Sequence, residues 1–229
     1  PGFTRTVALE AGIASGAIIT SFALTEPEAG SDAAGLRTSA KRDGNDWVIN
    51  GTKRYITNAN VAHLLTVMAR SNPNNKGGGG ISAFLVERGT PGLRFGKPEK
   101  KMGQQGAHIC DVIFEDCRVP ASQMMGGEAG EGMGFRSAMR TLDRGRLHVA
   151  ALCVGIAERL IDESVKYTSE RKQFGQAVAA FHLGQEMRAN QQTEASDIGA
   201  SRREVAGRRE HGADGRVRAR GRRMYEHAA

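Results

Sequence analysis

The chain has 229 residues, of which 39% are hydrophobic, 5% aromatic and 25% charged. This length suffices for one large domain or two small ones, and the absence of a long apolar run excludes a membrane-spanning helix. The three cysteines form no Cys-x-x-Cys pair and are too few for a disulfide framework, so we expect reduced, mostly buried thiols and no metal site. The first residues show no secretory signal pattern, which indicates a cytoplasmic protein.

Positive charge is concentrated towards the end of the chain. The net charge is +7, and residues 188–229 carry +4 of it through ten arginines and six acidic residues, without any lysine. Such a balance suits nucleic acid, anionic membranes or phosphorylated ligands. One interpretation is therefore a non-enzymatic basic binding protein. Interleaved aromatic residues and a recognition-helix pattern are missing from this segment, so we expect no nucleic-acid binding.

The first half of the chain alternates short apolar runs with turns. Residues 1–20 are rich in Ala and Gly and indicate the end of a broken helix and a loop. Residues 47–57 predict a hairpin whose tight turn is Asn50-Gly51, because this pair tolerates positive φ angles. Further strands are predicted at 64–69, 81–86 and 110–119. Strands at this spacing favour a β-barrel or sandwich.

The pattern becomes helical after the glycine-rich residues 126–132. One long helix is predicted, ending between 167 and 171, because five apolar residues recur at helical spacing. They are Ala150, Val154, Ala157, Ile161 and Val165. Gly155 inside this helix is expected to allow close helix packing. From about residue 191 no apolar period survives, and a charge-rich segment of this kind is expected to be disordered.

Residues 23–35 are the most informative stretch, reading Ala-Leu-Thr-Glu-Pro-Glu-Ala-Gly-Ser-Asp-Ala-Ala-Gly. They indicate a strand that leaves into a loop whose hydroxyls and backbone N–H groups suit a planar, heteroatom-rich ligand or a phosphate. The stretch resembles the first signature of the acyl-CoA dehydrogenases. Residues 53–58, then 101–103 with 112–120, and finally 171–175 resemble later motifs of the family in the same order.

The resemblance covers about residues 18–183 and implies an α+β fold. A β-barrel or sandwich-like middle domain is followed by the long helices of an incomplete helical bundle. The implied domains are a remnant of an N-terminal helical domain at 1–20, the middle β domain at 21–125, and the start of the C-terminal helical domain at 126–190. Residues 191–229 form a divergent Arg-rich tail, which we hypothesise to be disordered or to arise from a reading-frame shift. The chain is thus expected to be a fragment of a family member.

The same resemblance implies a flavin-dependent oxidation. A glutamate removes the α-proton of an acyl-CoA thioester, the β-hydrogen passes as hydride to N5 of FAD, and the product is a trans-2-enoyl-CoA. The implied electron acceptor is an electron-transfer flavoprotein, and family members assemble as dimers or tetramers. An acyl-CoA oxidase or a flavin monooxygenase, both using oxygen as the acceptor, is the alternative within the wider family.

Site residues follow from the motif positions that the resemblance matches. Thr25 is expected at the pyrimidine edge of the flavin, Tyr55 over one side of its ring, and Thr57 within reach of N5. The full set expected to bind FAD is Phe22, Leu24, Thr25, Ser31, Tyr55, Ile56, Thr57, Arg171, Gln173, Phe174 and His182. Of these, Arg171, Gln173 and Phe174 resemble residues that contact the flavin of the neighbouring subunit. Contacts to the acyl-CoA substrate are expected from Ser31, Asp143 and Arg146.

The catalytic base is expected to be missing. Most family members carry this glutamate in a late C-terminal loop, which we expect this chain to lack, and a minority carry it at the position of Gly145. Glycine abstracts no proton, and general-base catalysis contributes roughly 10²–10⁴-fold to such reactions. The chain by itself is therefore expected to be inactive.

Overall fold

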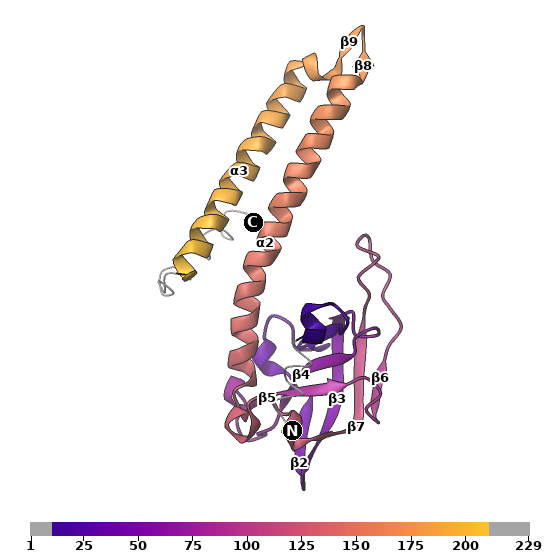
Figure 1. The fold of residues 1–229 in the computed structure, drawn as a ribbon, viewed down its shortest axis with the longest axis vertical. Coiled ribbons are helices and arrows are strands. Elements are labelled where there is room, and N and C mark those ends of the chain that lie inside the picture. Colours follow the sequence, from indigo (N-terminus) through magenta and orange to yellow (C-terminus); the bar gives the residue numbers. More distant parts are fainter. Residues whose placement is uncertain (1–10, 211–229) are drawn as a thin grey trace. The chain divides into compact units, whose positions relative to one another are not determined.

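The computed structural model describes residues 11–210. Its two long helices and its mixed sheet confirm the predicted α+β class (Figure 1). The chain divides between Arg140 and Thr141 into two compact units, a β unit and a helical unit, and each is described by itself.

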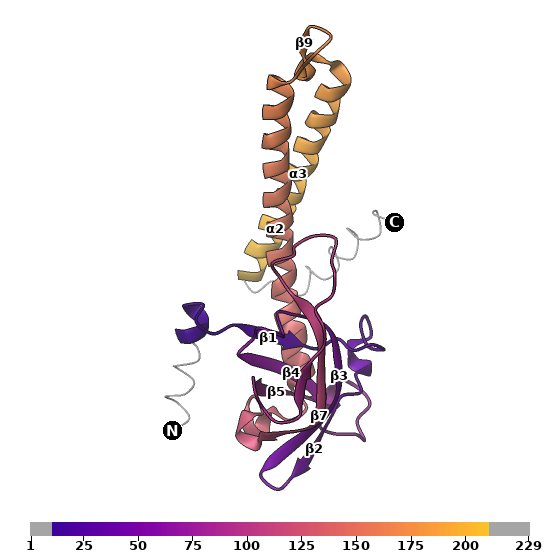
Figure 2. The ribbon, with the colours of Figure 1, turned by 90° about the vertical axis from the view of Figure 1, so that its right-hand side faces the viewer.

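Seven strands form the main sheet of the β unit. They are β1 Thr20–Ala23, β2 Ser39–Asp43, β3 Asp46–Thr57, β4 Leu64–Arg70, β5 Ile81–Glu87, β6 Leu93–Phe95 and β7 Ile109–Pro120. The sheet order is β1-β4-β2-β3-β7-β6, with β5 paired to β4. The β1–β4 pair is parallel, whereas β2–β3, β3–β7, β4–β5 and β6–β7 are antiparallel. The sheet curls, because β1 also contacts β3 and β5 also contacts β7. It has the form of a curled half-barrel, as Figure 2 shows.

Strands β4 and β5 are buried on both faces, because one hydrophobic cluster lies on each side of the sheet. The larger cluster fills the concave side, where Trp47 and Phe84 meet edge to face at 5.4 Å between ring centroids. The smaller cluster contains Met68 and Ile81 together with Phe135 and the following turn of helix. Fully buried central strands of this kind lose the alternation of apolar and polar residues.

The predicted hairpin turn at Asn50-Gly51 is wrong. β3 runs unbroken from Asp46 to Thr57, and the turn lies earlier, between the paired residues Asp43 and Asp46. Gly44 at its first central position has a φ of 60°, as a two-residue hairpin of type II′ requires. Gly51 instead sits at a register shift of β3 against β7 and has a φ of 147°. The Asn-Gly pair therefore marks a β-bulge, which also favours glycine.

Two helices form most of the described helical unit. α2 spans Gly134–Glu170, beginning in the β unit, and α3 spans His182–Glu210. The two run side by side in both views (Figures 1 and 2). The short strands β8 Lys172–Gln173 and β9 Gln176–Ala177 join them. Short 3-10 turns lie at Ala33–Gly35, Gly78–Gly80, Ala121–Gln123, Gly127–Gly130 and Val178–Ala180, and residues 11–14 are helical. The end of α2 at Glu170 confirms the predicted end of the long helix.

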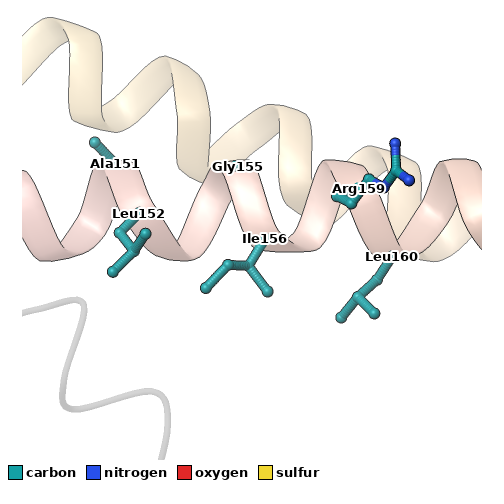
Figure 3. A pocket seen from close by; sticks show the side chains of 6 residues that line it. All are labelled: Ala151, Leu152, Gly155, Ile156, Arg159 and Leu160. Atoms are coloured by element: carbon teal, nitrogen blue, oxygen red, sulfur yellow. The ribbon is translucent and has the colours of Figure 1, made fainter. Parts of the chain in front are cut away.

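The apolar residues of α2 divide between two faces. Val154 and Ile161, both from the predicted stripe, are buried. A different set, exposed except for the half-buried Ala151, lines a shallow apolar groove, made by Ala151, Leu152, Gly155, Ile156, Arg159 and Leu160. Figure 3 shows Leu152, Ile156 and Leu160 pointing to the same side of the helix.

Two expectations about the helices differ from the structure. Gly155 is exposed and has nothing within 4 Å of its Cβ position, so it does not mediate close packing. Gly199 on α3 does, since its Cβ position lies 3.6 Å from a methyl of Val154. Residues 191–210 belong to α3, although we expected disorder. Their Ala, Arg, Glu and Gln content supplies helix propensity without apolar periodicity. The rest of the expected tail lies outside the described residues.

Candidate functional site

The segments of the first two motifs lie against each other in the β unit. The Ser21 hydroxyl donates to the Thr57 carbonyl oxygen at 2.6 Å, and the Arg54 N–H donates to the Thr25 carbonyl oxygen at 2.8 Å. These bonds align the end of β1 with the end of β3, although the two strands are not neighbours in the sheet order. Residues more than 25 positions apart in the sequence thereby form one continuous surface.

A buried ion pair lies beneath this surface. The Lys53 Nζ donates to Glu26 Oε1 at 2.7 Å and to the Leu24 carbonyl oxygen at 3.1 Å. The Glu26 carboxylate also accepts the backbone N–H groups of Arg37 at 2.6 Å and Thr38 at 3.0 Å. The side chains of Lys53 and Glu26 are 0% and 4% exposed. Nearly every polar atom of the pair is thus satisfied inside the protein.

Opposing influences act on the protonation of this pair. Burial lowers the pKa of Lys53 from 10.5 to about 8, against the charge of Glu26, which raises it. Burial raises the pKa of Glu26, but the charge of Lys53 and the hydrogen bonds from Lys53, Thr38 and Arg37 bring it below its ordinary value of 4.5. The ionised form of Glu26 is therefore stabilised in the folded protein.

A bulge at the end of β3 turns Tyr55 outward. The register against β7 shifts between Lys53 and Ile56, and Tyr55 has a φ of 58°. Tyr55 is 60% exposed, whereas Ile56 is 2% exposed. The Arg54 guanidinium lies 5.8 Å from the Tyr55 ring centroid and makes two hydrogen bonds to Asp111. A positive φ at an aromatic residue is strained, and such strain is concentrated at functional sites.

The other residues expected near the flavin ring differ in their exposure to solvent. Phe22 and Thr25 are half-buried and Thr57 is exposed. Phe22 also packs against the smaller hydrophobic cluster. Leu24 is buried in the smaller hydrophobic cluster, which leaves only its backbone groups for a ligand. Ser31 is exposed beyond a tight turn closed by two backbone hydrogen bonds between residues 26 and 29.

This donor set fits the pyrimidine side of a flavin. A flavin presents a flat, largely apolar ring with hydrogen-bonding heteroatoms along one edge, and hydroxyl and N–H groups there stabilise the charge of the reduced ring. An exposed aromatic side chain beside two hydroxyls supplies both kinds of contact.

The other positions expected to bind FAD lie in the helical unit, around the β8–β9 hairpin. Phe174 and Gly175 form its turn with φ angles of 51° and 80°. Phe174 is 94% exposed, and its ring meets Phe181 edge to face. Arg171 and Gln173 are exposed on the same connection, and His182 is exposed at the first residue of α3. A strained, solvent-facing Phe is typical of a binding surface rather than of a core.

The expected substrate contacts on α2 form one exposed pair. Arg146 donates to Asp143 at 3.0 Å, one helical turn apart. Gly145 lies between them and has no atom within 4 Å of its Cβ position, so a side chain there would meet open space. No carboxylate occupies position 145.

Sequence reasoning missed the partners that hold the site together. Glu26 lies in the first motif and Lys53 in the second, yet neither was identified as a site residue. The sequence offered no clear signal for them, because Glu26 lies in a loop after β1 and Lys53 in a strand that carries other charged residues. Asp111, which bonds the Arg54 guanidinium, could not be identified from the sequence either, because a half-buried acidic residue near the start of a strand is ordinary.

Comparisons with known proteins assign the chain to a family. The family model for the acyl-CoA dehydrogenase middle domain matches residues 21–117, and the model for the acyl-CoA dehydrogenase C-terminal domain matches residues 132–225. The probable acyl-CoA dehydrogenase YngJ of Bacillus subtilis (strain 168) is 46% identical over 169 residues, which are 74% of this chain and 44% of that protein.

Solved structures agree with the sequence matches. Butyryl-CoA dehydrogenase from Megasphaera elsdenii has a TM-score of 0.82 at 37% identity, covering 88% of this chain and 52% of that chain. A structure described as PigA with FAD and proline has a TM-score of 0.83 at 29% identity, covering 88% of this chain and 51% of that one. This chain spans about half the length of these proteins.

Within residues 11–210, none of the helices is sufficiently long and apolar to cross a membrane. Matches to both domain models, in order and over most of the sequence, place the chain in the acyl-CoA dehydrogenase family.

Proposed function

We propose that the whole protein oxidises an acyl-CoA thioester to the trans-2-enoyl-CoA with FAD, and that this chain supplies the flavin-facing part of the site. Acyl-CoA dehydrogenases are FAD-dependent flavoproteins. The observation that supports the proposal most is the hydrogen-bonded alignment of β1 with the end of β3, which brings the backbone at Thr25 next to that at Arg54 and the backbone at Thr57 next to Ser21. Bound FAD would accept the β-hydrogen of the substrate as hydride.

The proposed roles follow the chemistry of each side chain. The hydroxyls of Thr25 and Thr57 hydrogen-bond the polar edge of the ring and stabilise negative charge there. Phe22 and Tyr55 cover the ring and exclude water. Arg171 suits a pyrophosphate, because a guanidinium donates two parallel hydrogen bonds to phosphate oxygens. Arg171, Gln173 and Phe174 would contact the flavin of a neighbouring subunit, and His182 would bind FAD beside them.

The proposed substrate contacts are Ser31, Asp143 and Arg146, which would bind the CoA moiety. Arg146 adds a cation for the CoA phosphates. An electron-transfer flavoprotein is the proposed acceptor, and a homo-oligomer the proposed assembly. The domain division at residues 21–125 and 126–190 and the cytoplasmic location remain proposals, which expression of the separate domains and cell fractionation would test.

The reading-frame shift also remains a hypothesis. The family match that extends to residue 225 argues against it. Sequencing the source DNA in independent clones decides the question, because a single intact frame in every clone would rule the shift out.

The first experiment measures flavin binding by the chain. The purified chain is mixed with excess FAD, unbound FAD is removed, and the visible absorption spectrum is recorded. We expect a bound flavin spectrum that Thr25→Val and Thr57→Val weaken. Thr90→Val is a matched control, since its hydroxyl bonds only locally to the Glu87 carbonyl oxygen. An absence of bound FAD in the wild-type chain would contradict the proposed role of the chain.

The second experiment tests the missing base. We propose that the chain as it stands does not turn over, because position 145 carries glycine. Acyl-CoA should therefore not bleach the bound flavin of the wild-type chain. Gly145→Glu places a carboxylate in open space on α2, and we expect it to bring slow bleaching. Gly145→Gln, which has the same shape without a base, should not. Bleaching of the wild-type flavin would refute the proposed inactivity.

A further inference from the structure

The Glu26–Lys53 ion pair has no part in the proposed chemistry, yet it is the most deeply buried charged group in the described chain. Glu26 belongs to the first-motif loop and Lys53 to β3, and both side chains are buried in the β unit. Taking two charges out of water is unfavourable, and a buried ion pair often contributes less stability than well-packed apolar residues of the same volume. Stability alone is therefore a weak reason for placing this pair here.

The hydrogen bonds of the pair converge on the backbone that frames the site. Lys53, in β3, bonds the carbonyl oxygen of Leu24, the residue before Thr25. Glu26, the residue after Thr25, bonds the backbone N–H groups of Arg37 and Thr38. Three separate backbone segments are thereby fixed to one another by two side chains.

We propose that Glu26 and Lys53 are positioning residues that fix the Thr25 loop against β3, so that the hydroxyls of Thr25 and Thr57 stand at one edge of the site. Neither side chain is exposed enough to touch a ligand itself. The pair acts through the backbone of residues 24–26. Direct bonds from the rigid strand β3 hold this loop more closely than apolar packing, because hydrogen bonds to charged groups are short and directional. The claim that the loop faces a flavin rests on the proposed function, whereas the claim that the pair orders the loop does not.

The test measures amide hydrogen exchange across the full chain by mass spectrometry. Lys53→Met removes the cation, and we expect peptides covering residues 21–38 to exchange on the order of ten-fold faster or more, since the buried Glu26 carboxylate loses its counter-charge. Strand β5 should keep its wild-type exchange, because the pair makes no bond to it. Glu26→Gln should also speed exchange of these peptides, because the two backbone N–H groups bond to different carboxylate oxygens and an amide offers only one oxygen.

Two further variants separate positioning from general stability. The double variant Glu26→Gln with Lys53→Met contains no unpaired charge, so its global unfolding midpoint should return towards that of the wild type. Its loop should still exchange fast, because the bond to the Leu24 carbonyl oxygen is lost. If Lys53→Met fails to fold, the double variant carries the test. Arg94→Met is the matched control, since its partner Glu115 and Arg94 itself are each 62% exposed; it should leave residues 21–38 unchanged.

Flavin binding provides the second measurement. We expect the double variant to bind FAD on the order of ten-fold more weakly than the wild type, as loss of a preorganised loop predicts. Exchange that rises equally in β5 and in residues 21–38, or loop exchange that stays at the wild-type rate in the double variant, would overturn the inference. A wild-type chain that binds no FAD would overturn the proposed function, while the exchange experiment would still decide the role of the pair.

Discussion

Glu26 contributes stability that depends on its charge. Its pKa is lower in the folded chain than its ordinary value of 4.5, so folding favours the ionised form. This contribution is fully present above about pH 4.5 and is lost as the pH falls through the folded pKa. Lys53 is protonated throughout this range and faces Glu26 together with the N–H groups of Arg37 and Thr38.

We therefore predict that the melting temperature of the chain falls as the pH drops below about 4.5, and that Glu26→Gln lacks this part of the acid dependence. Thermal denaturation followed by circular dichroism between neutral and acidic pH measures both. Asp43→Asn, at a solvent-exposed ion pair with Arg118, is the control and should keep the wild-type acid slope. Equal slopes for the wild type and Glu26→Gln would contradict the prediction.

Replacement of Gly51 in the β unit should be damaging, because a Cβ there would meet Thr38. A Cβ there would lie 2.5 Å from the hydroxyl oxygen and 2.8 Å from the Cα of Thr38, at a φ of 147°. We predict that Gly51→Ala lowers the free energy of unfolding by roughly 2–4 kcal/mol, through strain and overpacking together. Gly44→Ala should cost only about 1 kcal/mol, since its φ is also positive but nothing lies within 4 Å. Urea denaturation of the two variants measures the difference; equal losses would contradict the role of Thr38.

The three cysteines should react unequally with thiol reagents. Cys110 and Cys117 are buried, and burial raises the pKa of Cys117 to about 11. Burial also raises the pKa of Cys110, whereas Cys153 is exposed. We predict that one thiol reacts quickly with dithionitrobenzoate in the native chain and that Cys153→Ser removes this reaction. All three should react in guanidinium chloride. Fast reaction of two or more thiols in native Cys153→Ser would contradict the assigned burial.

At the scale of elements, α2 illustrates how far periodicity predicts packing. The stripe at helical spacing correctly includes Val154 and Ile161, which are buried, but it also includes Val165, which is 44% exposed. Adjacent apolar residues on the helix, such as Leu160, point to another face and are more exposed still. Periodicity identifies an apolar arc around a helix, whereas the position of α3 decides which part of that arc is covered.

We therefore predict opposite outcomes for two neighbouring residues of α2. Ile161→Ala should lower the free energy of unfolding by about 2 kcal/mol, because it leaves a cavity at a side chain that is 8% exposed. Leu160→Ala should change it by no more than about 0.5 kcal/mol, because Leu160 is 62% exposed. Denaturant midpoints monitored by helical circular dichroism compare the two. A larger loss for Leu160→Ala would show that this face is covered in solution.

At the scale of the whole molecule, the exposed groove on α2 should govern solubility. Leu152, Ile156 and Leu160 lie on one side of the helix (Figure 3) and are 46–62% exposed. Contiguous exposed apolar surface of this kind promotes association. We predict that the wild-type chain aggregates at high concentration and that replacing all three residues by Gln reduces light scattering without loss of helical signal. A monodisperse wild-type sample at high concentration would contradict this prediction.

The sequence by itself determined the family, the α+β class and the motif positions, because these depend on residue types in a fixed order. It did not determine the conformation of those residues. Asn50-Gly51 satisfies a hairpin turn and a β-bulge equally well locally, and only the pairing of β3 with β7 selects the bulge. Residues 191–210 are helical, but their sequence has no apolar period from which this helix could be predicted.

Only the tertiary structure brought Glu26 and Lys53 together, 27 residues apart in the sequence and 2.7 Å apart in space. It also placed Tyr55 outward and Ile56 inward, because the bulge between Lys53 and Ile56 breaks the alternation of the strand. The physical reason is general. Local sequence sets which conformations a residue can adopt, whereas partners contributed by distant strands decide which buried charge is paired and which aromatic side chain is left to meet a ligand.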